Sequence, residues 1–368
     1  MICRSSIIAV SLLASLMGAG PLASGVVANE IPPLTADANV EAEVKKIVPQ
    51  LMEKYKVPGV SIAAVENGKL AWTAVFGVKA AGMEQPVTPE TIFEAASMTK
   101  PVVTYVALKL VEEGKLDLDR PLHLYLDKPY LENEPEYEKI TARMVMNHTT
   151  GFPNWRKKGE GLKLLSAPGT RYTYSGEGFV LLQEAMTKIT GQPLDVLVKE
   201  RLFDPLGMKN SSLVYRNNFG DFAEGHTKEG APKSKRTLYR KPNAAYSLYT
   251  TPSDYAKFLI EMMKSDRSAP HSLSKETIAE MLKPASPPKD LAPLKRRNTG
   301  GTGVARFGLA WTVETAVSGP RYSHSGSNPG FRCFSEFDPA AGYGLVIMTN
   351  ADSGTQLWKE LVNIIAKP

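Results

Sequence analysis

Cysteine is nearly absent from this sequence. Only Cys3 and Cys333 occur among its 368 residues, and Cys3 lies in an N-terminal stretch with the features of an export signal. Removal of that stretch leaves a single cysteine, which excludes an intramolecular disulfide in the mature chain. Cys333 stands among alternating apolar residues, so we expect a buried thiol rather than a reactive one.

Histidine is also scarce, and its five positions show no spacing typical of a zinc site: His123, His148, His226, His271 and His324. The sequence therefore argues against a metal-dependent enzyme and predicts no cofactor. The Gly-x-Ser-x-Gly motif is missing as well, which excludes an α/β-hydrolase. A glycine-rich run at 300–303 precedes no helical pattern, so it is not interpreted as a phosphate-binding loop.

Long apolar runs are confined to the N-terminus. Arg4 is the only charged residue before Glu30, and 7–17 form an apolar segment of signal-peptide length, followed by glycines and a proline. We interpret 1–28 as a signal peptide and 29–368 as the exported chain, with the bacterial periplasm as its expected location. Secretion, or tethering through an uncleaved N-terminal anchor, is the alternative. No second stretch is apolar enough to span a membrane, so no span is expected after cleavage.

Acidic residues are slightly outnumbered by basic ones, which gives a net charge of +6. Much of the excess lies in two runs, 228–241 and 294–297. We interpret these runs as solvated loops, with contact to an anionic lipid or cell-wall surface as the alternative. A nucleic-acid partner is not expected, because no recognised binding motif accompanies the charge.

The hydrophobic pattern predicts a sheet at both chain ends and helices between them. An amphipathic helix at 38–55 precedes two strands, which are joined by an Asn67-Gly68 hairpin signal. Helical patterns dominate from 97 to 283. The further elements expected are strands at 60–65, 70–76, 305–313, 321–323, 331–337 and 343–348, and a closing helix at 356–365.

This order favours an α+β fold in which an antiparallel sheet is built from both chain ends and flanked by the terminal helices. The sheet subdomain is predicted at about 38–90 and 300–368, and a mostly helical subdomain at about 91–299. The active site is expected in the seam between them.

The segment that carries the chemistry begins at Ser97. An apolar run with helical spacing follows it, and Pro101 fits only the first turn of a helix. Ser97 and Lys100, three residues apart at a helix start, would then share one face. Two other Ser-x-x-Lys matches compete: Ser272/Lys275, beside a short helix that Ser274 would cap, and 286–289, whose two prolines exclude a regular turn.

Two further stretches join this pattern. Tyr174 lies in the turn before a predicted helix, within Tyr174-Ser175-Gly176. His324-Ser325-Gly326-Ser327 lies at a predicted strand end, where small side chains would let a substrate approach backbone N–H groups.

Together these motifs resemble the serine hydrolases of the class C β-lactamase and penicillin-binding type, which include D-alanyl-D-alanine carboxypeptidases, D-aminopeptidases and lactamase-like esterases. Ser97-Met-Thr-Lys100 resembles their first motif, and Tyr174-Ser-Gly176 stands in the place of their Tyr-x-Asn. His324-Ser-Gly326 is similar to a His-x-Gly variant of their Lys-Thr-Gly, and His148 begins a segment similar to their His-Thr-Ser-Gly-Leu-Pro. The resemblance runs from about Val44 to the C-terminus and implies a β-lactamase-like fold.

The resemblance implies a role for each residue. Ser97 would be the nucleophile. Lys100 would be its base, provided that burial and neighbouring positive charge favour the neutral amine. Tyr174 would relay the proton, and His324 would bind the tyrosine or a substrate carboxylate. The oxyanion hole would consist of the backbone N–H groups of Ser97 and Ser327.

Substrate contacts are expected from Gly176, Ser325, Gly326 and Trp155, whereas His148 is expected to hold its loop in place. Gly176 departs from the family pattern, since an asparagine that contacts the substrate amide usually stands there. That departure and His324 argue against efficient β-lactam turnover. We therefore expect an acyl-enzyme hydrolase, a monomer, acting on a small ester or amide. The alternatives are a D-amino-acid peptidase acting on cell-wall peptides and a catalytically weak penicillin-binding sensor.

Overall fold

The computed structural model of the chain describes residues 38–132, 134–157, 159–217, 220–235, 237–285, 306–316 and 319–365. Four regions singled out above lie outside these residues: the signal peptide, the Ser-x-x-Lys match at 286–289, the basic run at 294–297 and the glycine-rich run at 300–303.

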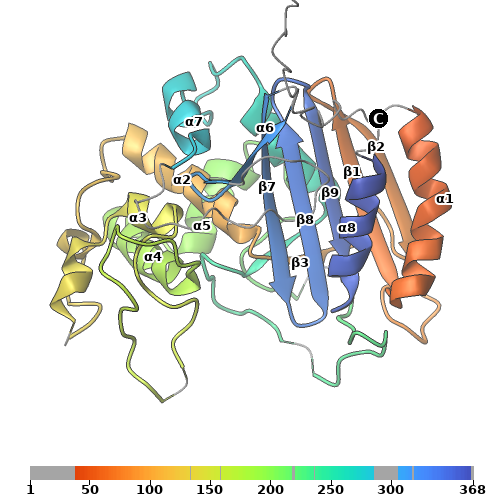
Figure 1. Cartoon of the computed structure of the whole chain (residues 1–368), viewed down its shortest axis with the longest axis horizontal. Helices are drawn as coiled ribbons and strands as arrows, with labels where there is room; N and C mark the ends of the chain where they lie inside the picture. Colours follow the sequence, from red (N-terminus) through yellow and green to blue (C-terminus); the bar gives the residue numbers. More distant parts are fainter. Residues whose placement is uncertain are drawn as a thin grey trace, which may run out of the picture.

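The protein is built on a seven-stranded antiparallel sheet with the order β2-β1-β9-β8-β7-β6-β5 (Figure 1). The strands are β1 (Gly59–Glu66), β2 (Lys69–Gly77), β5 (Arg306–Phe307), β6 (Thr312–Ala316), β7 (Gly319–Asn328), β8 (Phe331–Asp338) and β9 (Tyr343–Thr349). Strand β1 pairs with β9 along Val60 to Val65, so the two ends of the chain meet in the middle of the sheet. The predicted α+β class and the sheet made from both ends are confirmed.

The hairpin between β1 and β2 turns at Asn67 and Gly68, as the sequence predicts. Both residues have positive φ, 52° and 69°, which a tight type I′ turn requires. Strand β1 is buried on both faces, because its alternate residues pack against two different cores.

One face of the sheet is covered by the terminal helices α1 (Ala38–Tyr55) and α8 (Gly354–Ile365), which lie side by side in Figure 1. Helix α8 buries Leu357, Trp358, Leu361 and Val362, the spacing of one helical face. The Trp358 ring stacks on Phe334 of β8 with ring centroids 4.5 Å apart. This core holds the sheet between the first and the last helix.

The opposite face is covered by α6 (Pro252–Met263), which contacts β1, β2, β8 and β9. The remaining helices lie to the side of the sheet (Figure 1). They are α2 (Thr99–Glu112), α3 (Ala142–Met146), α4 (Gly176–Thr190), α5 (Leu194–Val198), which continues into a π-helical turn at Lys199–Phe203, and α7 (Lys275–Leu282), with short 3-10 helices at Leu122–Tyr125 and Pro135–Lys139. The described residues contain no helix long and apolar enough to cross a bilayer.

Two details differ from the predicted elements. The strand expected at 305–313 is wrong, because β5 and β6 are separate strands joined by a tight turn in which Ala310 has φ 63°. The alternating apolar residues continue through that turn, and no glycine marks its left-handed position. The sequence also does not reveal β3 (Phe93–Ala96) and β4 (Leu248–Thr250), a two-stranded sheet that is central to the site.

Candidate active site

Ser97 lies in the turn between the end of β3 and the start of α2, two residues before the helix begins. The preceding Ala96 is fully buried with φ +50°, a left-handed conformation that is strained for a residue with a Cβ. A bulge between Glu94 and Ala96 and a bond from Thr99 Oγ1 to the Ala96 carbonyl (2.6 Å) maintain this conformation. The turn leaves the Ser97 side chain partly exposed among buried neighbours.

Lys100 is fully buried, and its Nζ donates to Ser97 Oγ over 3.2 Å. A second bond, of 2.9 Å, goes to the backbone carbonyl of Ala245. The ammonium position also lies over the ring of Tyr174, 4.8 Å from its centroid, and 5.5 Å from that of Phe179. The predicted shared face of Ser97 and Lys100 is therefore present.

Tyr174 lies two residues before α4, which Ser175 caps by accepting the Gly178 N–H, a feature that the sequence signals only weakly. The Tyr174 ring lies between two histidines, with centroid distances of 4.2 Å to His148 and 6.4 Å to His324. Tyr174 thus contacts Lys100 on one side and lies within reach of His324 on another.

His148 is completely buried and accepts the Ser175 N–H at Nδ1 over 3.1 Å. It therefore fixes the segment that carries Tyr174, as well as beginning its own loop. Burial first, and then the electrostatic effects of Lys100 and His324, hold the pKa of His148 well below its usual value. The ring is neutral at physiological pH, which makes it a positioning group rather than a proton donor.

His324 lies within β7 rather than at its end, since the strand continues to Asn328. The pairing of β7 with β8 places His324 and Gly326 on the same face as Cys333, toward β3, whereas Ser325 and Ser327 share the opposite face. Ser325 and Ser327 can therefore contact a substrate at Ser97 only through their backbone atoms.

At Gly326, β7 passes close to β3. A Cβ at this position would lie 2.0 Å from the Ala95 carbonyl oxygen and 3.2 Å from Ala96 Cβ. Only glycine allows β7 to pass the turn that carries Ser97 at this distance. The pairing of β7 with β6 ends at Ser323, before the residues of β7 that pass the Ser97 turn.

Trp155 completes the site on the side of α4. Its indole covers the Cα of Gly176, and it makes an edge contact with Tyr246 at a centroid distance of 5.4 Å. Tyr246 follows Ala245, whose carbonyl binds Lys100. The predicted residues Ser97, Lys100, Tyr174, His324, Gly176, Gly326 and Trp155 thus surround one small region.

Three further groups in this region were not predicted: the Ala245 carbonyl, Tyr246 and Asn328. The Asn328 amide donates to Glu94 Oε2 (2.9 Å) and to the Tyr246 carbonyl (3.3 Å), which connects β7 to β3 and to the 245–246 loop. Backbone atoms carry no residue-type signal, so the Ala245 contact could not be read from the sequence.

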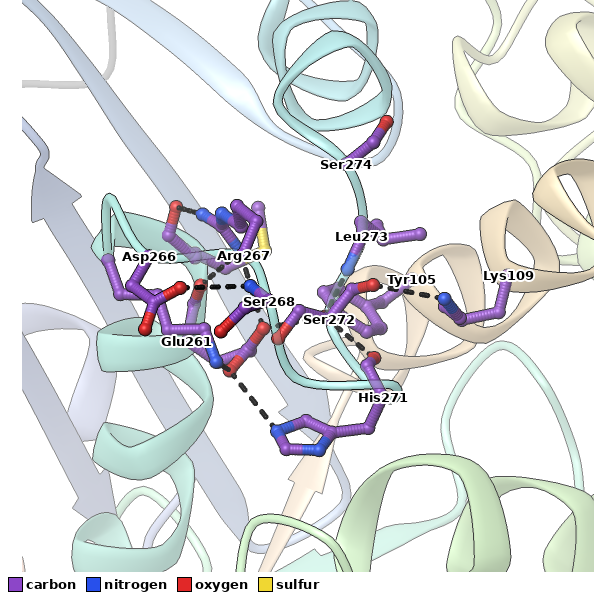
Figure 2. A network of polar contacts seen from close by, with 12 residues as sticks. Tyr105, Lys109, Glu261, Asp266, Arg267, Ser268, His271, Ser272, Leu273 and Ser274 are labelled. Atoms are coloured by element: carbon purple, nitrogen blue, oxygen red, sulfur yellow. Dashed lines mark hydrogen bonds and ion pairs between the residues drawn. The ribbon is translucent and has the colours of Figure 1, made fainter.

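The competing match at Ser272/Lys275 has a different structure, and Figure 2 shows the Ser272 backbone carbonyl bonded to Lys109. Ser272 is buried and Lys275 is exposed at the start of α7. Ser274 caps that helix by accepting the Thr277 N–H over 3.1 Å, as predicted. Arg332 of β8 is paired with Asp352 at 2.9 Å.

Cys333 is buried as predicted, and burial raises its thiol pKa to about 12. Across the described part of the chain, no cluster of three histidine, cysteine or acidic side chains is arranged to hold a metal ion.

The chain is similar to known proteins over most of its length. The sequence model of the family described as Beta-lactamase matches residues 44–366. Protein flp of Staphylococcus aureus (strain N315) is 25% identical over 342 residues, which cover 87% of this chain and 64% of that protein, so the chain spans under two thirds of that relative. A Beta-lactamase of Pseudomonas fluorescens is 24% identical over 346 residues, or 85% of this chain and 94% of that one.

Solved structures show the same fold. A class C beta-lactamase superposes with a TM-score of 0.75 at 21% identity, covering 90% of this chain and 96% of the other. The D-alanine carboxypeptidase AmpC of Burkholderia cenocepacia gives a TM-score of 0.72 at 22% identity, covering 88% and 98%. An octameric penicillin-binding protein homologue of Pyrococcus abyssi gives 0.73 at 22% identity, covering 88% and 76%.

Proposed function

The chain belongs to the Beta-lactamase family, a family of serine hydrolases, and we propose that it cleaves small esters or amides through an acyl-enzyme on Ser97. The observation that carries this proposal is the buried Lys100 Nζ, 3.2 Å from Ser97 Oγ. A serine hydroxyl needs a base within hydrogen-bond reach to become a nucleophile, and this geometry meets that condition.

In the first half of the reaction, Lys100 accepts the Ser97 proton while Oγ bonds to the acyl carbon. The carbonyl oxygen of the substrate becomes an oxyanion. When the intermediate collapses, the bond to the leaving alcohol or amine breaks and that group takes up the proton. Tyr174 lies against Lys100 and is the relay for this transfer. In the second half, the same pair takes a proton from a water molecule, whose oxygen bonds to the acyl carbon. The bond from that carbon to Ser97 Oγ then breaks, Oγ takes up the proton, and the acid is released.

The oxyanion is assigned to the backbone N–H groups of Ser97 and Ser327. The positive φ of Ala96 sets the direction of the Ser97 N–H, and the close passage of Gly326 brings the β7 edge beside it. One such donor typically contributes about 10²–10³ in rate. His324 faces the same region from β7 and is assigned to orient Tyr174 or a substrate carboxylate.

The preference for esters over β-lactams and peptides rests on position 176. The asparagine of the family motif is replaced by Gly176, and Trp155 fills its space. A D-amino-acid peptidase and an acylated sensor are the competing functions, and the experiment below separates all three.

The test is a screen of p-nitrophenyl esters, D-alanyl-D-alanine peptides and a cephalosporin with the wild type and Ser97→Ala. We expect ester hydrolysis that falls by on the order of 10⁴-fold or more in the variant. Full activity of Ser97→Ala would overturn the proposal. Release of D-alanine would favour the peptidase, and a persistent β-lactam adduct on Ser97 by mass spectrometry would favour the sensor.

We also propose that the protein is exported to a bacterial periplasm after cleavage near residue 28 and acts there as a monomer. N-terminal sequencing of the protein recovered from the periplasm, and light scattering of the purified protein, test these two points. An intact N-terminus at Met1 or an oligomeric mass would contradict the corresponding point.

A further inference from the structure

The indole of Trp155 occupies the space that a side chain at position 176 would fill. A Cβ placed on Gly176 would lie 2.3 Å from Trp155 Cη2 and 2.5 Å from Cζ2. Position 176 is two residues after Tyr174, whose ring lies against Lys100 Nζ, so it lies near the proposed acylation site. An apolar ring therefore replaces a polar amide at this point of the site.

Trp155 is held from both sides by its neighbours. Asn154 accepts the Gly176 N–H with its carbonyl oxygen and with Oδ1, both at 3.0 Å, and accepts the Glu177 N–H with its carbonyl oxygen at 3.1 Å. Arg156 makes a two-pronged contact with the buried Glu177 carboxylate, with distances of 3.0 and 2.8 Å. The start of α4 thus fixes the residues before and after Trp155.

The exposed side of Trp155 borders a groove with a volume of about 440 Å³. Its lining includes the apolar side chains of Pro153, Leu162 and Leu165, and also the charged side chains of Arg156, Lys157, Glu160 and Lys163. Trp155 is 42% exposed and Leu165 is 63% exposed, which is unusual for large apolar side chains. The indole of Trp155 lines this groove and also contacts Gly176 and Tyr246, so Trp155 lies between the groove and the region around Ser97.

We propose that Trp155 determines specificity by binding the aliphatic acyl chain of an ester substrate, which runs from Ser97 along the indole toward Leu165. This inference rests on the proposed function and goes beyond it, because it names the chemical class of the acyl group. The apolar side chains of the groove, which a chain from Ser97 would reach across the indole, match a straight alkyl chain. Each methylene that becomes buried there raises kcat/KM by about fourfold.

The experiment measures kcat/KM for p-nitrophenyl acetate, butyrate and octanoate. The wild type is expected to prefer octanoate over acetate by at least tenfold. Trp155→Ala should lower the value for octanoate and butyrate at least tenfold more than that for acetate. Leu165→Ser, at the far end of the groove, should lower only the octanoate value. Leu124→Ala, an exposed leucine on the 3-10 helix Leu122–Tyr125 and no part of the groove lining, is the matched control and should change none.

Gly176→Asn is an independent test, because its side chain must displace the indole. It should reduce the preference for octanoate as Trp155→Ala does, with both melting temperatures within a few degrees of the wild type. If both variants keep the chain-length profile of the wild type, the acyl-chain inference is overturned while the proposed function stands. If no ester is cleaved in a Ser97-dependent manner, the proposed function fails, and this inference fails with it.

Discussion

Helix α2 carries a polar cluster toward each end, and the two clusters use the same residue types in different ways. Near the N-terminus, Lys100 bonds a loop carbonyl and the Ser97 hydroxyl, and Tyr174 lies over it. Farther along, Lys109 bonds the Ser272 carbonyl at 3.0 Å and Glu112 at 2.8 Å, and Tyr105 lies on the same helix one turn before it.

The second cluster is organised around a carboxylate (Figure 2). Glu261 is buried, and Tyr105 donates to it over 2.8 Å while accepting the Leu273 N–H at 3.0 Å. Lys264 pairs with it at 2.6 Å and Arg267 at 3.3 Å. Burial, and then the charge of Glu261, raise the pKa of Tyr105 above its usual range, so its hydroxyl keeps the proton that it donates.

The difference lies in the counter-charge. Among the described residues, Lys100 has no carboxylate partner in a hydrogen bond or ion pair. A buried amine that is bonded only to a hydroxyl, a carbonyl and aromatic faces can exchange a proton with its hydroxyl neighbour, whereas a saturated ion-pair network holds its protons in place. The first cluster is therefore suited to proton transfer, whereas the second stabilises the fold.

Replacing the two lysines should give the largest contrast. Lys100→Met is expected to lower kcat for a p-nitrophenyl ester by about 10³-fold, because Ser97 loses its base, while the melting temperature is retained in the buried site. Lys109→Met, the matched change at the other end of the helix, should leave kcat within twofold of the wild type. Steady-state kinetics with thermal melts check both. Equal kinetic losses in the two variants would contradict the assignment.

Substitution of Tyr174 should affect mainly activity, and substitution of Tyr105 mainly stability. Tyr174→Phe is expected to lower kcat by about 10²-fold, with little change in the free energy of unfolding, because only the relay hydroxyl is lost. Tyr105→Phe should do the reverse and reduce the free energy of unfolding by about 1–3 kcal/mol, because buried Glu261 loses a donor. Urea unfolding and kinetics on both variants are the measurement. A stable Tyr105→Phe would show that this network is not stabilising.

The close approach of β7 to β3 at Gly326 predicts a smaller effect, which falls on both stability and activity. Gly326→Ala places a Cβ against the Ala95 carbonyl, so β7 must move away from the Ser97 turn. We expect a loss of about 1–3 kcal/mol in stability, with roughly a tenfold fall in kcat. Gly114→Ala, just after α2, meets no atom within 4 Å although its φ is +67°, and should lose stability alone. An unchanged kcat in Gly326→Ala would show that β7 is not part of the active site.

The contrast also shows where the sequence is informative. The helix at 38–55 and the Asn67-Gly68 turn were predictable because apolar spacing and turn residues act locally. Ser97 and Lys100 could be placed together because three residues along a helix start are neighbours in any fold. The Ala245 carbonyl and the indole over Gly176 could not be predicted, since both contacts join segments far apart in the chain. The turns at Ala310 and Ala96 were not predicted, because a left-handed backbone position is usually occupied by glycine and both of these residues are alanine.

The smallest predicted effect concerns pH. His148 keeps a lowered pKa in the folded state, whereas in the unfolded chain it titrates near 6.5. Above that pH both states are neutral and the residue has no effect. Below it, only the unfolded state takes up the proton, so the free energy of unfolding falls by up to about 1.4 kcal/mol per pH unit.

His148→Asn removes this titration while preserving its surroundings. Asparagine tolerates the φ of 59°, and its Oδ1 can accept the Ser175 N–H in place of Nδ1. Loss of ring packing on Tyr174 should lower stability by a constant amount at every pH. Urea unfolding at pH 7.5 and 5.5 should therefore show a fall that is about 1.4 kcal/mol smaller in the variant than in the wild type. Equal falls in the free energy of unfolding of the two proteins would mean that His148 also takes up a proton in the folded state. A positive charge on His148 would then require a nearby carboxylate in the cluster at the start of α2, as Glu261 provides in the other cluster.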